Sequence, residues 1–204
     1  MTRYSLREFW SRSNSDNYDE EDFIDVADSM MCSPRGPWLG GGAVRRFISG
    51  LEQSSDFDFF FRDETQLNQT AGYLESIGIV KIKETEHHLH YQGPIGQSKL
   101  PRDIQLIRFK YYASAEEVAD SFDYTICQFI FDGHDLITGE HSLWDLGRKK
   151  LVLHKLTYPV STMRRLLKYT KQGYTACAGC LASILQATHD NPALMQELNI
   201  QYVD

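Results

Sequence analysis

The stretch GGAVRRFISGLEQSSDFDFFF, residues 41–61, decides the fold. Pro and Gly are concentrated just before and into it, in SPRGPWLGGG, which predicts a loop, and AVRRFISG predicts a short helix ending at Gly50. The segment SSDFDFFFRD then alternates acidic and aromatic residues before an apolar finish, which is typical of a half-buried strand. We therefore expect a glycine loop that opens a helix, followed by a strand with Asp56 and Asp58 on one face.

This combination predicts phosphate chemistry, although a glycine turn or an Asp-x-Asp alone is more often an ordinary turn or a solvated surface. A Gly-Gly loop that opens a helix offers backbone N–H groups to a triphosphate. Phosphoryl-type transfer needs in-line positioning and charge neutralisation, which two Mg²⁺ ions bridged by adjacent carboxylates supply. We predict that Asp56 and Asp58 hold both Mg²⁺ ions, with Mn²⁺ as a substitute.

The rest of the chain predicts further helices and strands. Helical spacing of apolar residues occurs at 19–31, 65–77, in AEEVADSF after a capping Ser114, and at 161–185 with an interruption near Gly173. Strands are predicted at IVKIKET, HHLHYQG and RDIQLIRFKYY, the last with Asp103 and Gln105 on one face. We expect an α+β fold with a mixed, mostly antiparallel sheet of about five strands and helices on one side. The expected domains are a head with an N-terminal helical extension, residues 1–157, and a helical neck, residues 158–204.

The stretch 41–61 resembles the Gly-Gly-x-Val-Arg, helix, Asp-x-Asp signature of nucleotidyltransferases of the DNA polymerase β superfamily. In motif order it is most similar to the head and neck of class II CCA-adding enzymes and bacterial poly(A) polymerases. Downstream, EEVADSFDYTIC is similar to that family's Arg-Arg-Asp-Phe-Thr-Ile-Asn segment, and RRLLKYTKQGY is similar to its Arg-x-x-Arg-Phe neck helix. The resemblance covers roughly Trp38 to Tyr174. The positions of the first motif that match are Gly41, Gly42, Val44, Arg45, Asp56 and Asp58.

The resemblance implies transfer of a nucleoside monophosphate from an NTP to an acceptor hydroxyl, with release of pyrophosphate. An RNA 3′ end is slightly favoured as the acceptor over a protein side chain or a small molecule. The resemblance implies that Gly41, Gly42 and Arg45 bind the triphosphate, with Arg46 as a compensating cation. It implies that Asp103 completes the metal site or helps to deprotonate the acceptor, and that Asp123 and Tyr124 contact the sugar or base. Arg165 and Lys168 of the neck would close the nucleotide pocket.

Three positions depart from the family pattern and favour a second hypothesis. Ser121 and Phe122 stand where the family has paired arginines, and Gln105 competes with Asp103 for the position of the third carboxylate. These changes are typical of a nucleotide-binding or interaction module that has kept the fold and lost activity. Retention of both Asp56 and Asp58 favours the enzyme, because a binding module has no physical need for two adjacent carboxylates. A purely structural protein would require the glycine loop and this strand to be far apart.

Composition limits the remaining possibilities. The 204 residues are 42% hydrophobic and 12% aromatic, enough for a real core, and no run approaches the roughly 18 apolar residues of a spanning helix. We expect a soluble, cytoplasmic protein without a membrane partner, and the sequence does not predict its oligomeric state. The net charge of −7 does not suggest a protein that holds long nucleic acid by phosphate neutralisation alone. A local basic patch at 148–150 and 164–171 is the candidate for RNA or nucleotide contact, against an ordinary solvated helix face.

The cysteines and histidines carry weaker signals. Four cysteines are too few for a disulfide scaffold, and reduced thiols are the simplest interpretation. Cys177 and Cys180 form a C-x-x-C, for which two packed helical cysteines are favoured over a zinc site. His87, His88 and His90 cluster on a predicted hairpin, where a polar edge or an acceptor-binding surface is favoured over metal ligation.

Overall fold

The computed structural model describes residues 1–6, 18–97 and 99–190, and the chain divides into two compact units. The first unit comprises residues 1–121 and 127–140, and the second comprises 122–126 and 141–204. The boundary expected between 157 and 158 therefore lies inside the second unit, where Tyr124 forms an antiparallel bridge with Leu153. Residues 191–204 of the expected neck lie outside the described part of the chain.

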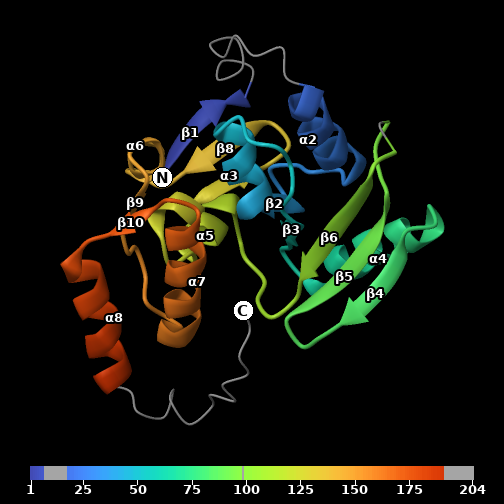
Figure 1. The fold of residues 1–204 in the computed structure, drawn as a ribbon. Helices are drawn as coiled ribbons and strands as arrows, with labels where there is room; N and C mark the ends of the chain where they lie inside the picture. The colour runs from blue at the N-terminus through green and yellow to red at the C-terminus, as the bar shows by residue number, and fades with distance from the viewer. Residues whose placement is uncertain (7–17, 98, 191–204) are drawn as a thin grey trace. The chain divides into compact units, whose positions relative to one another are not determined.

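The first unit is built on an eight-stranded sheet (Figure 1). Its spatial order is β1 (Thr2–Ser5), β8 (Asp135–Thr138), β7 (Phe129–Phe131), β2 (Trp38–Gly40), β3 (Phe57–Phe60), β6 (Pro101–Ile107), β5 (His88–Pro94) and β4 (Val80–Glu84). Neighbouring strands are antiparallel except β3 and β6, which are parallel. The mixed, mostly antiparallel α+β sheet is thus confirmed, with eight strands instead of about five. The additional strands include β2 and β7, which have three residues each and are too short to show an alternation in sequence.

Aromatic side chains attach three helices to one face of this sheet. On α2 (Tyr18–Ser29), Phe23 is fully buried and stacks on Phe47 of α3 (Gly42–Ile48) with ring centroids 4.3 Å apart. The Phe23 ring also lies 6.5 Å from Phe57 on β3. On the same face, Tyr91 of β5 donates a hydrogen bond to Glu75 of α4 (Glu64–Ser76) at 2.9 Å. Since Phe57 and Tyr91 both pair with Ile104, the alternate residues of β3, β6 and β5 lie on the opposite face.

The helix predicted after Ser114 is also present in the first unit, as α5 (Ala115–Asp120). The Ser114 hydroxyl accepts a hydrogen bond from the backbone N–H of Glu117 at 3.3 Å, which satisfies one of the unpaired amides of the first turn. Helix α5 contacts β7 and β8. A 3₁₀ turn, η1 (Thr125–Cys127), then leads to β7.

The second unit contains the predicted helical tail. Its elements are α6 (Ser142–Gly147), β9 (Lys150–Leu151), α7 (Pro159–Lys171), β10 (Thr175–Ala176) and α8 (Ala178–Asp190). Strands β9 and β10 form a short parallel pair. The predicted interruption near Gly173 is present, because this residue has a φ of 86° and separates α7 from β10. Helices α7 and α8 contact one another along this tail (Figure 1).

None of the helices in the described ranges combines the length and apolar character needed to cross a bilayer.

Candidate functional site

The glycine loop and the Asp-x-Asp strand are adjacent in space. Gly40 at the end of β2 is directly opposite Asp58 on β3. Gly41 follows with a φ of 77° at the N-terminal cap of α3, and a Cβ built there would lie 2.8 Å from Oδ2 of Asp58. A Cβ at Gly42 would lie 2.8 Å from the hydroxyl of Ser55. Glycine at these two positions therefore allows the loop backbone to approach the acidic end of β3, which is the juxtaposition that a phosphate and metal site requires.

Asp56 and Asp58 present their carboxylates on one face of the sheet. Asp56 is exposed and immediately precedes β3, while Asp58 is half-buried within it. Gln105 of β6 pairs with Asp58 in the parallel register, and its side-chain amide donates a hydrogen bond to Oδ2 of Asp56 at 2.5 Å. Two carboxylates fit Mg²⁺, which proteins commonly hold through one or two carboxylates completed by substrate phosphates. Among the described residues, no three His, Cys, Asp or Glu side chains group as a metal site.

Asp103 lies on the same face as Gln105 but is bonded to β5. Its Oδ1 accepts from Nε2 of His90 at 2.9 Å and from the amide of Gln92 at 3.1 Å. Gln92 is the register partner of Asp103, and His90 is the register partner of Gln105. Gln105 is thus the residue bonded directly to the Asp56 carboxylate, and Asp103 lies two residues earlier on the same strand.

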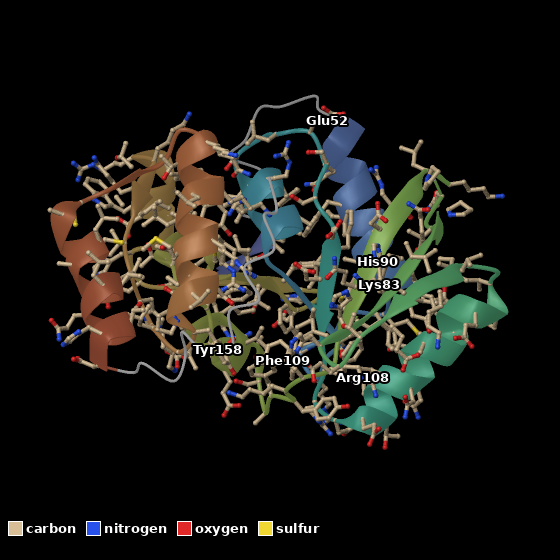
Figure 2. The ribbon with its side chains drawn as sticks, turned by 60° about the horizontal axis from the view of Figure 1, so that its bottom comes forward. Glu52, Lys83, His90, Arg108, Phe109 and Tyr158 are labelled. Atoms are coloured by element: carbon tan, nitrogen blue, oxygen red, sulfur yellow. The ribbon has the colours of Figure 1, made fainter. Side chains whose placement is uncertain are left out.

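The β4–β5 hairpin, which carries His87, His88 and His90, lies next to this site. The sequence did not reveal this proximity. His90 pairs with Lys83 of β4, and the two side chains lie next to one another in Figure 2. The His88 and His90 rings are 6.4 Å apart, which extends the polar face along β5. Burial lowers the pKa of His88, and the positive charges of His90 and Lys83 lower it further, against an opposing effect of Asp56. His88 and His90 are two residues apart, as Asp103 and Gln105 are, so each pair lies on one face of its strand. The sequence alone did not give the β5–β6 register that brings the two pairs together.

The two arginines of α3 have different environments. Arg45 is buried, with a relative exposure of 5%, and its backbone N–H donates to the Gly41 carbonyl at 3.2 Å in the first helical turn. Arg46 donates from Nε to the carbonyl oxygen of Glu52 at 2.5 Å, which fastens the loop between α3 and β3. Their predicted contacts with a triphosphate stay predictions.

The second unit brings Asp123, Tyr124 and Arg165 together. The buried Asp123 carboxylate accepts from Nη1 of Arg165 at 2.7 Å and from the hydroxyl of Thr162 at 3.0 Å. The fully buried Tyr124 donates its hydroxyl proton to the Thr162 carbonyl at 3.1 Å. This network attaches residues 122–126 to α7, so its members hold the unit together whatever further role they have.

Lys168 and the C-x-x-C lie elsewhere in the second unit. Lys168 is exposed on the last turns of α7, one turn beyond Arg165. Cys177 is exposed and Cys180 is buried at the start of α8, and both are free thiols. Burial raises the pKa of the Cys180 thiol, and the neighbouring Cys177 raises it further. The packed position of Cys180 agrees with the structural interpretation of this motif.

Sequence comparison connects the chain with one family and one curated relative. A family model described as "Gabija anti-defense 2 family protein" matches residues 2–149. A curated protein of Bacillus phage SPbetaL7, named "Gabija anti-defense 2", is 26% identical over 140 residues, which cover 67% of this chain and 33% of that protein. The chain therefore spans about a third of the length of that relative.

Structure comparison supports the nucleotidyltransferase fold. The Thermotoga maritima CCA-adding enzyme complexed with tRNA superimposes with a TM-score of 0.61 and 14% identity, over 97% of this chain and 48% of that chain. A tRNA nucleotidyltransferase complexed with a primer tRNA and an incoming ATP analog superimposes with a TM-score of 0.55 and 21% identity, over 86% of this chain and 52% of that chain. The chain thus has a nucleotidyltransferase-like fold and spans about half the length of these solved proteins.

Proposed function

The chain belongs to the Gabija anti-defense 2 family, and from that premise we propose that it is a metal-dependent nucleotidyltransferase acting against a defence system. The reaction transfers a nucleoside monophosphate from an NTP to an acceptor hydroxyl and releases pyrophosphate. The family description supports the anti-defence setting, and the residues beside the glycine loop support the chemistry.

One observation carries the proposal: the Asp58 carboxylate lies against Gly41, and Asp56 lies beside it on the same face. A Cβ at Gly41 would come within 2.8 Å of Oδ2 of Asp58, so the loop backbone and the carboxylate are in close proximity. A triphosphate there would meet the loop amides, and Mg²⁺ bound to both carboxylates would neutralise its charge and that of the leaving pyrophosphate.

The chain's own groups have defined tasks in this reaction. Asp56 and Asp58 hold the metal, and the turn at Gly41 and Gly42 admits the phosphates. Arg45 and Arg46 on α3 add positive charge near the triphosphate. The acceptor oxygen bonds to the α-phosphorus as the bond from that phosphorus to the pyrophosphate oxygen breaks.

The acceptor is proposed as an RNA 3′ end, with a protein side chain as the next candidate. RNA is supported by the tRNA-bound proteins that share this fold. A protein hydroxyl is supported by the family description, because a component of a defence system is a direct target for inactivation by nucleotidyl transfer.

A non-catalytic nucleotide-binding module is the competing function, and Gln105 favours it. Gln105 competes with Asp103 for the position of the third carboxylate, and its amide donates to Asp56. A neutral side chain at that position would neither bind a metal as strongly nor accept a proton. The enzyme would transfer label from the NTP only when a metal is present, whereas the module would bind the NTP without a metal and transfer no label.

The test incubates the protein with each α-labelled NTP, Mg²⁺ or Mn²⁺, and a pool of short RNAs, with a bacterial protein extract in a parallel reaction. The double variant Asp56→Ala/Asp58→Ala removes the metal ligands, and Glu86→Ala is the matched control because its side chain is 84% exposed in the β4–β5 turn. Metal-dependent transfer by the wild type and the control, and none by the double variant, would establish the enzyme. NTP binding that ignores metal, with no transfer to either acceptor class, would establish the module.

A further inference from the structure

We propose that His90, oriented by Asp103, is the general base that removes the proton from the acceptor hydroxyl. This inference rests on the proposed nucleotidyl transfer and assigns a catalytic group to it. It comes from the hairpin β4–β5, outside the glycine loop and the Asp-x-Asp strand.

The need for such a base follows from Gln105. This residue faces Asp58 across the parallel pair and donates to Asp56, so the neighbouring strand brings an amide to the carboxylate pair. An amide nitrogen carries no lone pair for a proton and an amide oxygen is a very weak base. Since Asp56 and Asp58 are assigned to the metal, the proton acceptor has to come from another residue on this face.

The strand register places His90 on the same face as Asp56 and Asp58, where the proton acceptor is needed. Asp58, Gln105 and His90 are aligned on three successive strands, β3, β6 and β5. Neighbouring strands lie about 4.8 Å apart, so the Cα atoms of His90 and Asp58 are separated by roughly 10 Å with their side chains on one face. A hydroxyl bound between the metal and the hairpin would lie within reach of an imidazole on β5.

The bond to Asp103 prepares His90 for this role. Nε2 of His90 lies 2.9 Å from Oδ1 of Asp103, and the carboxylate accepts when Nε2 carries the hydrogen. Nδ1 then keeps its lone pair, which is the arrangement a neutral imidazole base requires. Gln92 donates a second hydrogen bond to the same oxygen at 3.1 Å and fixes the carboxylate.

The charges around His90 come from three strands. Asp103 on β6 stabilises the imidazolium formed when His90 accepts the proton. Lys83 on β4, its register partner, and His88 on β5, with its ring 6.4 Å away, oppose that charge. The carboxylate is the only one of these groups bonded directly to the ring in the described part of the chain, so it sets the orientation.

The proton balance is simple. As the acceptor oxygen forms its bond to the α-phosphorus, its proton moves to Nδ1 of His90, and the pyrophosphate departs with the electron pair of the broken P–O bond. The imidazolium returns its proton to water before the next turnover, so no further reactant is needed.

The experiment measures two reactions and one binding constant at several pH values. The reactions are transfer of α-labelled NTP to a short RNA with a free 3′ hydroxyl and metal-dependent release of the nucleoside monophosphate by water. The binding constant is that of the Mg²⁺–NTP complex. The variants are His90→Ala and Asp103→Asn, with His87→Ala as the matched control on the same hairpin, since the His87 side chain is 66% exposed.

We expect His90→Ala to lower the transfer rate about 10²-fold or more, with Mg²⁺–NTP affinity within about twofold of the wild type, since general bases contribute factors of that size. Added imidazole should restore part of the rate. Asp103→Asn should also lower the transfer rate with Mg²⁺–NTP affinity unchanged, because it removes the carboxylate that orients the His90 ring. His87→Ala should behave as the wild type.

Three results would overturn the inference, and they separate it from the proposed function. If Asp58→Ala abolishes transfer while His90→Ala keeps the wild-type rate and pH profile, the enzyme stands and His90 is not its base. If His90→Ala loses rate and NTP affinity together without imidazole rescue, His90 is structural. If the wild type transfers no label to RNA or to water here, nor to protein in the test of the proposed function, the nucleotidyl transfer itself fails and the base assignment with it.

Discussion

Gln105 donates a hydrogen bond from its side-chain amide to Oδ2 of Asp56 across the parallel β3–β6 pair. This contact joins residues 49 positions apart in the chain. It gives one carboxylate of the candidate metal pair a neutral partner where a negative one would repel it. The same contact makes Gln105 the most informative position to change.

Gln105→Glu should increase the affinity for Mg²⁺ by about tenfold, because a third carboxylate adds charge and an oxygen ligand. Titration calorimetry with Mg²⁺ measures the affinity. Gln92→Glu adds the same charge on the neighbouring strand, and an equal gain there would mean that net charge, not the site, is responsible.

Asp58→Asn should reduce the proposed metal-dependent transfer about 10³-fold, because the amide keeps the shape of the side chain but loses the charge that we propose binds the metal. The midpoint of thermal unfolding should change little, since Asp58 is only half-buried. Rates with Mg²⁺ and Mn²⁺ and a melting curve test both parts. Retained transfer at the wild-type rate would remove Asp58 from the metal site.

Gly41→Ala should reduce activity much more than Gly50→Ala. Both residues have positive φ, 77° and 60°, so both substitutions carry a similar backbone strain of about 1 kcal/mol. A Cβ at Gly41 would meet Asp58 at 2.8 Å, whereas a Cβ at Gly50 has nothing within 4 Å. Equal losses of activity, measured at matched folded fraction, would show that strain alone is the cause.

Arg165→Ala should destabilise the protein by about 2–3 kcal/mol, because it leaves the buried Asp123 carboxylate without its cation. Arg164→Ala, at the neighbouring exposed position on α7, should change the free energy of unfolding by less than about 0.5 kcal/mol. Urea denaturation of the two variants provides the comparison. Equal stabilities would contradict a structural role for the Arg165–Asp123 pair.

His88 should make the fold less stable in mild acid. Burial and the charges of His90 and Lys83 lower its pKa in the folded state below the ordinary value of 6.5, so the unfolded chain binds the proton more tightly. Its contribution to stability is therefore complete above about pH 6.5 and is lost as the pH falls through the folded-state pKa. His88→Gln should flatten the dependence of unfolding free energy on pH below 6.5, and His87→Gln should not.

Local patterns predicted much of this structure. The apolar spacing at 19–31 identified α2, in which Phe23, Val26 and Ala27 are fully buried. Glycine and serine identified element boundaries, since Gly50 and Gly173 have positive φ and Ser114 caps α5. These signals are local because a helix turn or a cap involves residues within four positions.

What the sequence did not predict depends on pairing between distant strands. The neighbours of Gln105 on either side are Asp58 and His90, and both follow from register, which a single sequence does not encode locally. The assignment of residues 122–126 to the second unit likewise depends on the bridge from Tyr124 to Leu153. The adjacency of Gly41 and Asp58 was expected from the motif, whereas the bonds of Asp103 to His90 and Gln92 were not.

The parallel β3–β6 pair also affects when the candidate site forms during folding. The segment between the two strands contains α4, β4 and β5, so the chain must close a long loop before Asp56 and Gln105 meet. Loop closure of this kind tends to come after local helix and hairpin formation. A nascent or partly folded chain would therefore contain its helices and the β4–β5 hairpin before Asp56 and Gln105 meet, and the candidate site would form only when the central sheet is complete.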